Sequence, residues 1–150
     1  MRAYKQGRFK PTNPEKYKGN AENIIFRSDW ERRIMCWMDT NKNILEWSSE
    51  EIIVLYRSPV DNSVRRYFPD IYMKYRLPSG ELKETLLEIK PDVQTRPPVK
   101  PSRKTKKYLQ EVVTYGINQA KWQAAEKYCS DRGWDFRVLT EHDLFPKRGK

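Results

Sequence analysis

Three residues with the chemistry to bind a metal ion and act on a phosphate stand close together in the middle of the chain. Asp70 follows Pro69, and a single residue separates Glu88 from Lys90. Carboxylate oxygens, completed by a backbone carbonyl such as that of Ile89, are ligands of hard divalent cations such as Mg²⁺ or Mn²⁺. A lysine beside such an ion would stabilise charge on a phosphate or position the attacking water, whose pKa the ion lowers. We therefore interpret Asp70, Glu88 and Ile89 as metal ligands and Lys90 as a catalytic residue.

Two β-strands must bring these residues together. Residues 71–77 alternate between apolar and polar side chains, residues 85–90 form a largely apolar run, and Pro78-Ser79-Gly80 supplies a turn between them. Because residues two apart on a strand share a face, Glu88 and Lys90 should lie side by side. Placing this charged pair on an apolar strand costs desolvation energy, which a functional site would explain. The alternative is an ordinary cross-strand ion pair at the edge of a sheet.

The chain before this strand pair predicts a helix and further strands. Ser28 and Glu31 match a capping box, in which each side chain satisfies a free amide at the start of a helix. Four apolar residues then recur at helical spacing and predict a core-facing stripe: Trp30, Ile34, Trp37 and Met38. Pro69 should interrupt a strand ladder. We expect an antiparallel meander of residues 51–57, 64–77 and 81–90.

After the strand pair the chain predicts a proline-rich loop, a long helix and a last strand. Four prolines within residues 91–107 are incompatible with the interior of a sheet. Residues 103–132 show helical spacing, with a bend or join expected at Gly116 and a C-terminal stop at Gly133. Residues 134–139 form a strand that can pair in parallel after this long crossover. The expected fold is α/β, with a mixed central β-sheet flanked by helices.

The net charge of +10 is concentrated in two segments. Residues 1–27 hold seven basic and two acidic side chains, residues 91–107 hold six and one, and the remainder is balanced. Lysine and arginine contacts to phosphates release counterions and give sequence-independent affinity for a polyanion. We therefore expect DNA as a partner, while loops kept basic only for solubility are the alternative. The DNA contacts expected from the proline-rich segment are Arg96, Lys100, Arg103, Lys104 and Lys107.

Length and composition bound the remaining possibilities. The 150 residues fit one folded domain, 28–145, which contains the basic proline-rich loop 91–103 and is flanked by a basic N-terminal arm, 1–27, and a basic tail, 146–150. The sequence has no apolar run of membrane-spanning length and no signal-peptide pattern, so we expect a soluble intracellular protein without a membrane partner or a small-molecule cofactor. Cys36 and Cys129 stand among apolar residues, which favours buried free thiols over a zinc site.

Seven blocks of the sequence carry a resemblance to known nucleases: Asn13-Pro-Glu-Lys-Tyr17, Arg27-Ser-Asp-Trp-Glu31, Arg66-Tyr-Phe-Pro-Asp70, Glu88-Ile-Lys-Pro91, Pro97-Pro-Val-Lys-Pro101, Asn118-Gln-Ala-Lys-Trp122 and Phe136-Arg-Val-Leu-Thr-Glu141. Pro69-Asp70 with Glu88-Ile89-Lys90 resembles the signature of the PD-(D/E)xK nuclease superfamily, which has a restriction-endonuclease-like fold. In order and spread nearly end to end, the blocks together resemble the head completion nucleases of T-even-type tailed bacteriophages.

The resemblance implies a Mg²⁺- or Mn²⁺-dependent DNA endonuclease that acts in phage head completion after DNA packaging. It implies phage head or portal proteins as partners, and a location at the head or portal vertex of the virion and in the host cytoplasm during assembly. It favours Glu31 as an acidic catalytic and metal-binding residue, in addition to its capping role. On the long helix it indicates Gln119 as a residue near the site and Lys121 as a DNA contact, whereas polar residues on helices more commonly contact solvent.

Two other functions remain open on the sequence alone. A non-catalytic DNA- or portal-binding head completion protein with a degenerate nuclease fold could use some of the five Trp and nine Tyr as a docking patch. The complete set of Asp70, Glu88 and Lys90 weighs against such decay. A sequence-specific DNA-binding module would need a recognition helix, and the sequence offers none that is recognisable.

Overall fold

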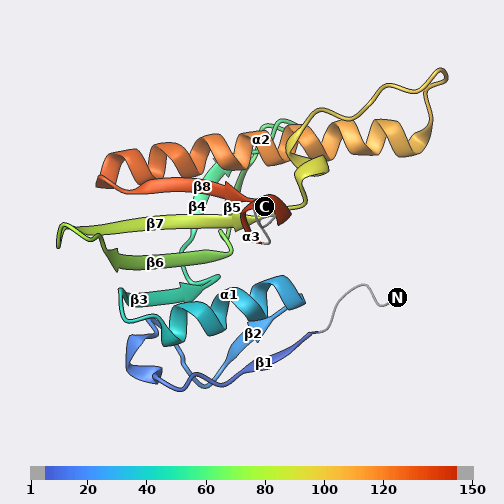
Figure 1. Ribbon diagram of the computed structural model, residues 1–150. Helices are drawn as coiled ribbons and strands as arrows, with labels where there is room; N and C mark the ends of the chain where they lie inside the picture. Colours follow the sequence, from blue (N-terminus) through green and yellow to red (C-terminus); the bar gives the residue numbers. More distant parts are fainter. Residues whose placement is uncertain (1–5, 145–150) are drawn as a thin grey trace.

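A four-stranded mixed β-sheet forms the centre of the computed structural model, which describes residues 6–144 (Figure 1). In spatial order its strands are β3 (Ile44–Ser49), β6 (Ile71–Arg76), β7 (Leu82–Ile89) and β8 (Asp135–Leu139). The pairs β3–β6 and β6–β7 are antiparallel, and β8 pairs with β7 in parallel. The α/β fold with a mixed central sheet, expected from the sequence, is confirmed.

The parallel pairing of β7 and β8 depends on helix α2 (Lys106–Arg132), which runs along one face of the sheet (Figure 1). The Thr105 side chain caps its start by accepting from the N–H of Tyr108, and Gly133 ends it in the left-handed conformation at φ 74°. The predicted stop is confirmed, but Gly116 does not divide the helix. A glycine inside a helix costs only about 1 kcal/mol, which the packing of α2 offsets. Within residues 6–144 no helix combines the length and the apolar character needed to cross a membrane.

Helix α1 (Asp29–Thr40) covers the opposite face of the sheet (Figure 1). Its predicted start is confirmed, because the Ser28 side chain accepts from the N–H of Glu31 at 3.1 Å. The predicted core-facing stripe is wrong at Trp37, whose surface is 49% exposed. The buried arc of the helix is centred on Met35 and Met38, so the line from Trp30 to Trp37 falls on its edge.

The basic N-terminal segment is largely part of the folded core. β1 (Gly7–Phe9) pairs antiparallel with β2 (Ile24–Phe26), and the short helix η1 (Pro14–Lys16) lies between them. Phe9, Tyr17 and Ile24 are buried in the cluster that α1 forms with the sheet. Residues 7–26 therefore form packed structure in place of the expected extended arm, while residues 1–5 lie outside the described residues.

Lys16 illustrates how a basic residue of this segment serves the fold. Its ammonium group donates to the carbonyls of Met38, Asp39 and Asn41 at 2.7, 3.0 and 2.9 Å. These carbonyls lie at the C-terminal end of α1, where a positive charge is favourable to the helix dipole. Lys16 therefore caps the C-terminal end of α1.

The predicted three-stranded meander is wrong in its second member, 64–77, which is divided into two strands that belong to different sheets. β4 (Val54–Arg57) and β5 (Val64–Tyr67) form a separate antiparallel hairpin that packs against α2, and β3 takes the place beside β6. The predicted interruption at Pro69 is confirmed and explains the separation. Pro69 is buried between β5 and β6 and has no N–H to continue a ladder, so the two strands belong to different sheets.

The segments around α2 and β8 complete the fold. After β7 the chain forms the short helix η2 (Asp92–Thr95) and then a loop without strand or helix that reaches Thr105. The long helix begins at Lys106, three residues later than predicted, because Thr105 caps it. After β8 the chain forms the short helix α3 (Glu141–Leu144), and Phe145 and the basic tail 146–150 lie outside the described residues.

The two cysteines differ in their surroundings. Cys129 is buried on the inner side of α2, as predicted. Cys36 is exposed, so the prediction of a buried thiol is wrong there. The buried arc of α1 contains Met35 but excludes the next residue, since successive helical residues are rotated by about 100°.

Candidate active site

The N-terminal end of α1, the start of β6 and the end of β7 lie at the same end of the molecule (Figure 1). In the antiparallel pairing of β6 and β7, Ile71 stands opposite Leu87, so Asp70 lies across from Glu88. Lys90 follows β7 on the side of Glu88. The predicted strand pair therefore brings the carboxylates and the ammonium group to one end of the sheet.

Asp70 is anchored by backbone contacts on both sides. Its Oδ2 accepts from the N–H of Ile89 at 2.8 Å, and its carbonyl oxygen accepts from the N–H of Glu50 at 3.2 Å. Burial and then the charge of Glu88 raise the pKa of Asp70 well above its usual value of 3.8, with a smaller contribution from Glu31. The Ile89 N–H opposes this shift. The carboxylate is held rigidly in an environment that disfavours its own charge.

Glu88 is the most enclosed charged group of the site, with 6% of its surface exposed. Its Oε1 accepts from the hydroxyl of Tyr67 at 2.5 Å, and its Oε2 lies 3.6 Å from the Nζ of Lys90. Burial raises the pKa of Glu88, while the Tyr67 hydrogen bond, Lys90 and Lys121 act in the opposite direction. Both oxygens of this carboxylate are therefore oriented by named partners.

Two ammonium groups flank Glu88. The side chain of Lys90 is 26% exposed, so its ammonium group can contact both the buried Glu88 carboxylate and solvent. Lys121 approaches from α2, and its Nζ lies 5.5 Å from the ring centroid of Tyr67 and 5.9 Å from that of Tyr56. Lys121, expected as a DNA contact, thus belongs to the surroundings of Glu88.

Glu31 performs its capping role beside this cluster. Its Oε1 accepts from the N–H of Arg27 at 2.8 Å, one residue before the predicted partner Ser28. Burial raises the pKa of Glu31, with further contributions from Glu50 and Glu88. Glu31 therefore caps α1 and is close enough to the other carboxylates for their charge to raise its pKa.

The sequence interpretation missed Glu50 and Tyr67. Glu50 follows β3 with φ 56°, in the left-handed region that a glutamate rarely adopts, and its carboxylate accepts from the Arg27 side chain at 3.0 and 3.1 Å. No turn signal marked this position. Tyr67 lies within Arg66-Tyr-Phe-Pro-Asp70, so its proximity to Asp70 was visible, but its contact with Glu88 depends on how the β4–β5 hairpin packs.

Gln119 and Ile89 occupy different positions relative to the cluster. Gln119 is half-buried on α2, and its side chain makes no hydrogen bond with any other residue in the described part of the chain. Ile89 contributes its N–H to Asp70, while its side chain packs on the α1 side of the sheet. The structure brings Ile89 into the site and gives no contact that joins Gln119 to it.

The basic residues of the loop after β7 are mostly free of protein partners. Arg96 pairs with Asp92. The side chains of the other four predicted DNA contacts are exposed and make no ion pair or hydrogen bond with other described residues; we call these residues the arm cluster: Lys100, Arg103, Lys104 and Lys107. They lie on the loop and the first turn of α2, which project beyond the sheet at the same end as the site (Figure 1). Leu109 and Val112 of this part of α2 are also exposed.

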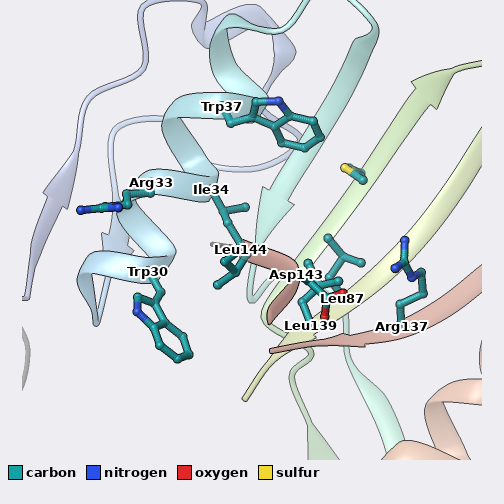
Figure 2. A pocket seen from close by; sticks show the side chains of 10 residues that line it. Trp30, Arg33, Ile34, Trp37, Leu87, Arg137, Leu139, Asp143 and Leu144 are labelled. Carbon is teal, nitrogen blue, oxygen red and sulfur yellow. The ribbon is translucent and has the colours of Figure 1, made fainter. Parts of the chain in front are cut away.

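Two hollows in the surface are not lined by Glu31, Asp70 or Glu88. One, of about 560 Å³, lies between Trp30, Ile34 and Trp37 of α1 and Leu139 of β8 (Figure 2). Its sheet residue Leu87 faces away from the neighbouring Glu88, so this hollow opens on the other face of the sheet. The second, of about 760 Å³, lies between the loop residues 93–99 and α2.

The donor set of the site fits a hard divalent cation. The negative charges of Asp70 and Glu88 repel each other, and a bound cation would relieve that repulsion. Both side chains offer carboxylate oxygens, which are the donors that Mg²⁺ prefers. Within residues 6–144, no group of three or more His, Cys, Asp or Glu side chains stands ready to hold a metal ion. Mg²⁺ is commonly bound by one or two carboxylates and keeps its remaining positions for water or phosphate oxygens.

Comparison with known proteins places this chain in a class of nucleases. The family described as TnsA-like endonuclease N terminal matches residues 41–141, which include Asp70, Glu88 and Lys90 but not Glu31. The chain therefore belongs to the TnsA-like endonucleases of the PD-(D/E)xK type. Among individual proteins it is similar to the head completion nuclease of Enterobacteria phage T4, with 40% identity over 142 residues that cover 92% of each chain. No solved structure matches the chain. The resemblance noted in the sequence is confirmed.

Proposed function

We propose that the protein is a metal-dependent endonuclease that hydrolyses DNA phosphodiester bonds during phage head completion. The observation that carries this proposal is the convergence of Asp70, Glu88 and Lys90 at one end of the β6–β7 pair. Membership in a family of endonucleases supports the reaction class, and the name of the T4 relative supports the biological setting. Head or portal proteins are the partners that this setting requires.

The side chains of the site would have two roles, binding the cation and contacting the scissile phosphate. Asp70 and Glu88 would hold Mg²⁺ or Mn²⁺, with the Ile89 carbonyl and Glu31 as further donors. The ion, when bound, lowers the pKa of a coordinated water and neutralises phosphate charge. Lys90, at 3.6 Å from Glu88 and partly open to solvent, would place its ammonium group on the scissile phosphate. Gln119 on α2 is the remaining proposed catalytic residue.

DNA would be held by the basic surface next to the site. The arm cluster carries four charges that no described protein group neutralises, and it projects beyond the sheet on the side of Lys90 (Figure 1). Arg96 at the base of this loop and Lys121 beside Glu88 would extend the contacts toward the scissile bond. Such contacts to phosphates provide affinity without reading sequence.

Plasmid nicking tests the proposal. Supercoiled DNA incubated with the protein and Mg²⁺ should be cut, and a chelator should stop the reaction. Asp70→Ala, Glu88→Gln and Lys90→Ala should each lower the rate by about 100-fold or more, as expected when a group that stabilises the transition state is removed. Each variant should still fold and bind DNA.

The chain contains its own control for these variants. Glu81-Leu-Lys83 has the same spacing as Glu88-Ile-Lys90 and lies at the opposite end of β7, where Glu81 precedes the strand and is exposed beside the turn. Glu81→Gln should therefore cut DNA at the rate of the wild-type protein. Full activity in all three site variants would reject the enzyme. DNA binding without any cleavage by the wild-type protein would favour the non-catalytic head completion protein with a degenerate nuclease fold.

A further inference from the structure

Tyr67 makes a contact that neither the fold nor the proposed metal ligands require. It is 4% exposed, lies at the end of β5, and its hydroxyl donates to Glu88 Oε1 at 2.5 Å. A tyrosine hydroxyl buried among apolar groups needs a polar partner, but any backbone carbonyl could have served. In this molecule the partner is the most enclosed carboxylate of the site.

We propose that Tyr67 is a positioning residue that fixes the orientation of the Glu88 carboxylate for a divalent cation. This inference rests on the proposed function and adds a residue to it. With one lone pair of Oε1 engaged by Tyr67, Oε2 is the oxygen that faces Lys90 and the more open donor for the cation. Glu88 would therefore act as a ligand through one oxygen, which leaves room for water and phosphate around the ion.

The position of Tyr67 is itself fixed by packing away from the cation. Tyr67 belongs to a buried cluster with Val54 and Tyr56 of the hairpin and Trp122 and Ala125 of α2. The β4–β5 hairpin makes no strand pairing with the central sheet. The hairpin therefore packs against α2 and carries the hydroxyl that orients Glu88.

Loss of this hydroxyl should weaken cation binding. A carboxylate that keeps its burial but loses its donor is left with an unsatisfied oxygen, and it can also rotate away from the orientation that the ion needs. Removal of a hydrogen-bond partner behind a metal ligand commonly lowers metal affinity by about 10- to 100-fold. A purely structural tyrosine would lower stability without changing the affinity of the folded protein for a cation.

Tyr56 provides a matched control. It lies on the other strand of the same hairpin, is similarly buried, and also has its ring near Lys121, but its hydroxyl makes no hydrogen bond with a described residue. Tyr56→Phe and Tyr67→Phe therefore remove the same atom from the same cluster. They differ in whether that atom contacts Glu88.

The experiment measures Mn²⁺ binding to the full chain by isothermal titration calorimetry, without DNA, together with the thermal unfolding of each variant. We expect Tyr67→Phe to bind Mn²⁺ about 10-fold more weakly than wild type and Tyr56→Phe to bind it equally well. As a measurement on the wild-type protein, Mg²⁺ should shift the NMR resonances of the ¹³C-labelled Tyr67 ring and leave those of Tyr56 in place.

The possible outcomes distinguish the metal centre from the positioning role of Tyr67. If Glu88→Gln loses Mn²⁺ binding but Tyr67→Phe keeps wild-type affinity, the role of Tyr67 is rejected and the metal centre stands. If wild type and Glu88→Gln bind Mn²⁺ equally, the metal centre is rejected and the role of Tyr67 with it. Should Tyr67→Phe fail to fold, unshifted Tyr67 resonances in Mg²⁺-loaded wild-type protein reject the inference, and shifted ones uphold it.

Discussion

Replacing Asp70 by Asn should stabilise the metal-free protein while removing its proposed activity. The Asp70 carboxylate is largely buried, stands across the strand pair from Glu88, and is close enough to Glu31 to feel its charge. Asparagine has the same shape, and its side-chain oxygen can still accept from the N–H of Ile89. The substitution therefore removes the charge repulsion and retains the hydrogen bond.

The size of the effect follows from the geometry. Side chains directly opposite each other on antiparallel strands lie about 5 Å apart. Two like charges at that distance repel by about 3 kcal/mol at an effective dielectric constant near 20. The nearby ammonium of Lys90 offsets part of this repulsion. We expect a net gain of about 1 to 2 kcal/mol, which for a chain of this size raises Tm by about 2 to 8 °C.

The gain should depend on pH in a defined direction. Burial and the charge of Glu88 raise the pKa of Asp70 in the folded protein above its usual value of 3.8, so the folded state retains a proton that the unfolded state has released. Below that usual value both states are protonated and the two proteins should be equally stable. As the pH rises through the folded pKa, the wild-type protein loses stability relative to Asp70→Asn.

Thermal unfolding in the presence of a chelator, from pH 4 to pH 8 (roughly the interval above the usual aspartate value), measures this difference. Mg²⁺ should raise the Tm of wild type and not that of the variant. Asp61 supplies the opposite control, because hydrogen bonds from Ser63 and Arg65 lower its pKa to about 2, so Asp61→Asn should destabilise at neutral pH. The reasoning is refuted if Asp70→Asn unfolds at or below the wild-type Tm at pH 8 without metal.

Two further predictions concern the arm cluster and the cysteines. Alanine at all four positions of the arm cluster should weaken DNA binding and reduce the slope of log affinity against log salt by about 0.9 per lost phosphate contact, as measured by fluorescence anisotropy; an unchanged slope would identify these residues as solubility charges only. A thiol reagent should modify Cys36 quickly and leave Cys129 unreacted until the protein is denatured, because burial raises the pKa of Cys129 to about 11. Rapid modification of two thiols in the native protein would contradict the packing of α2.

The elements that the sequence predicted correctly are those encoded by neighbouring residues. Ser28 and Glu31 specify the start of α1 through contacts within four residues, and Gly133 ends α2 through its own backbone conformation. The β6–β7 pair is joined by a tight turn, so its register follows from local pattern. For the same reason Asp70, Glu88 and Lys90 could be placed together before the structure was known.

The errors concern choices that depend on distant parts of the chain. Residues 51–56 are richer in β-branched residues than β3, yet β3 is the strand that pairs with β6, because Pro69 redirects the chain between the two sheets. Trp37 matched a helical stripe, but which arc of α1 is buried depends on how the helix sits on the sheet. The position of Glu50 and the contact between Tyr67 and Glu88 depend on tertiary packing, so no spacing in the sequence pointed to them.

The two halves of α2 differ in how much of the protein packs against them, so their local stability should differ. Its C-terminal half is held by buried Trp122, Ala125 and Cys129, whereas Leu109 and Val112 near its start face solvent. Amide protection should therefore fall steeply toward Lys106, since helical turns without tertiary neighbours open frequently. DNA bound along the first turns of α2 would contact these exposed residues and stabilise the turns. Amide protection near Lys106 should therefore increase when DNA is bound.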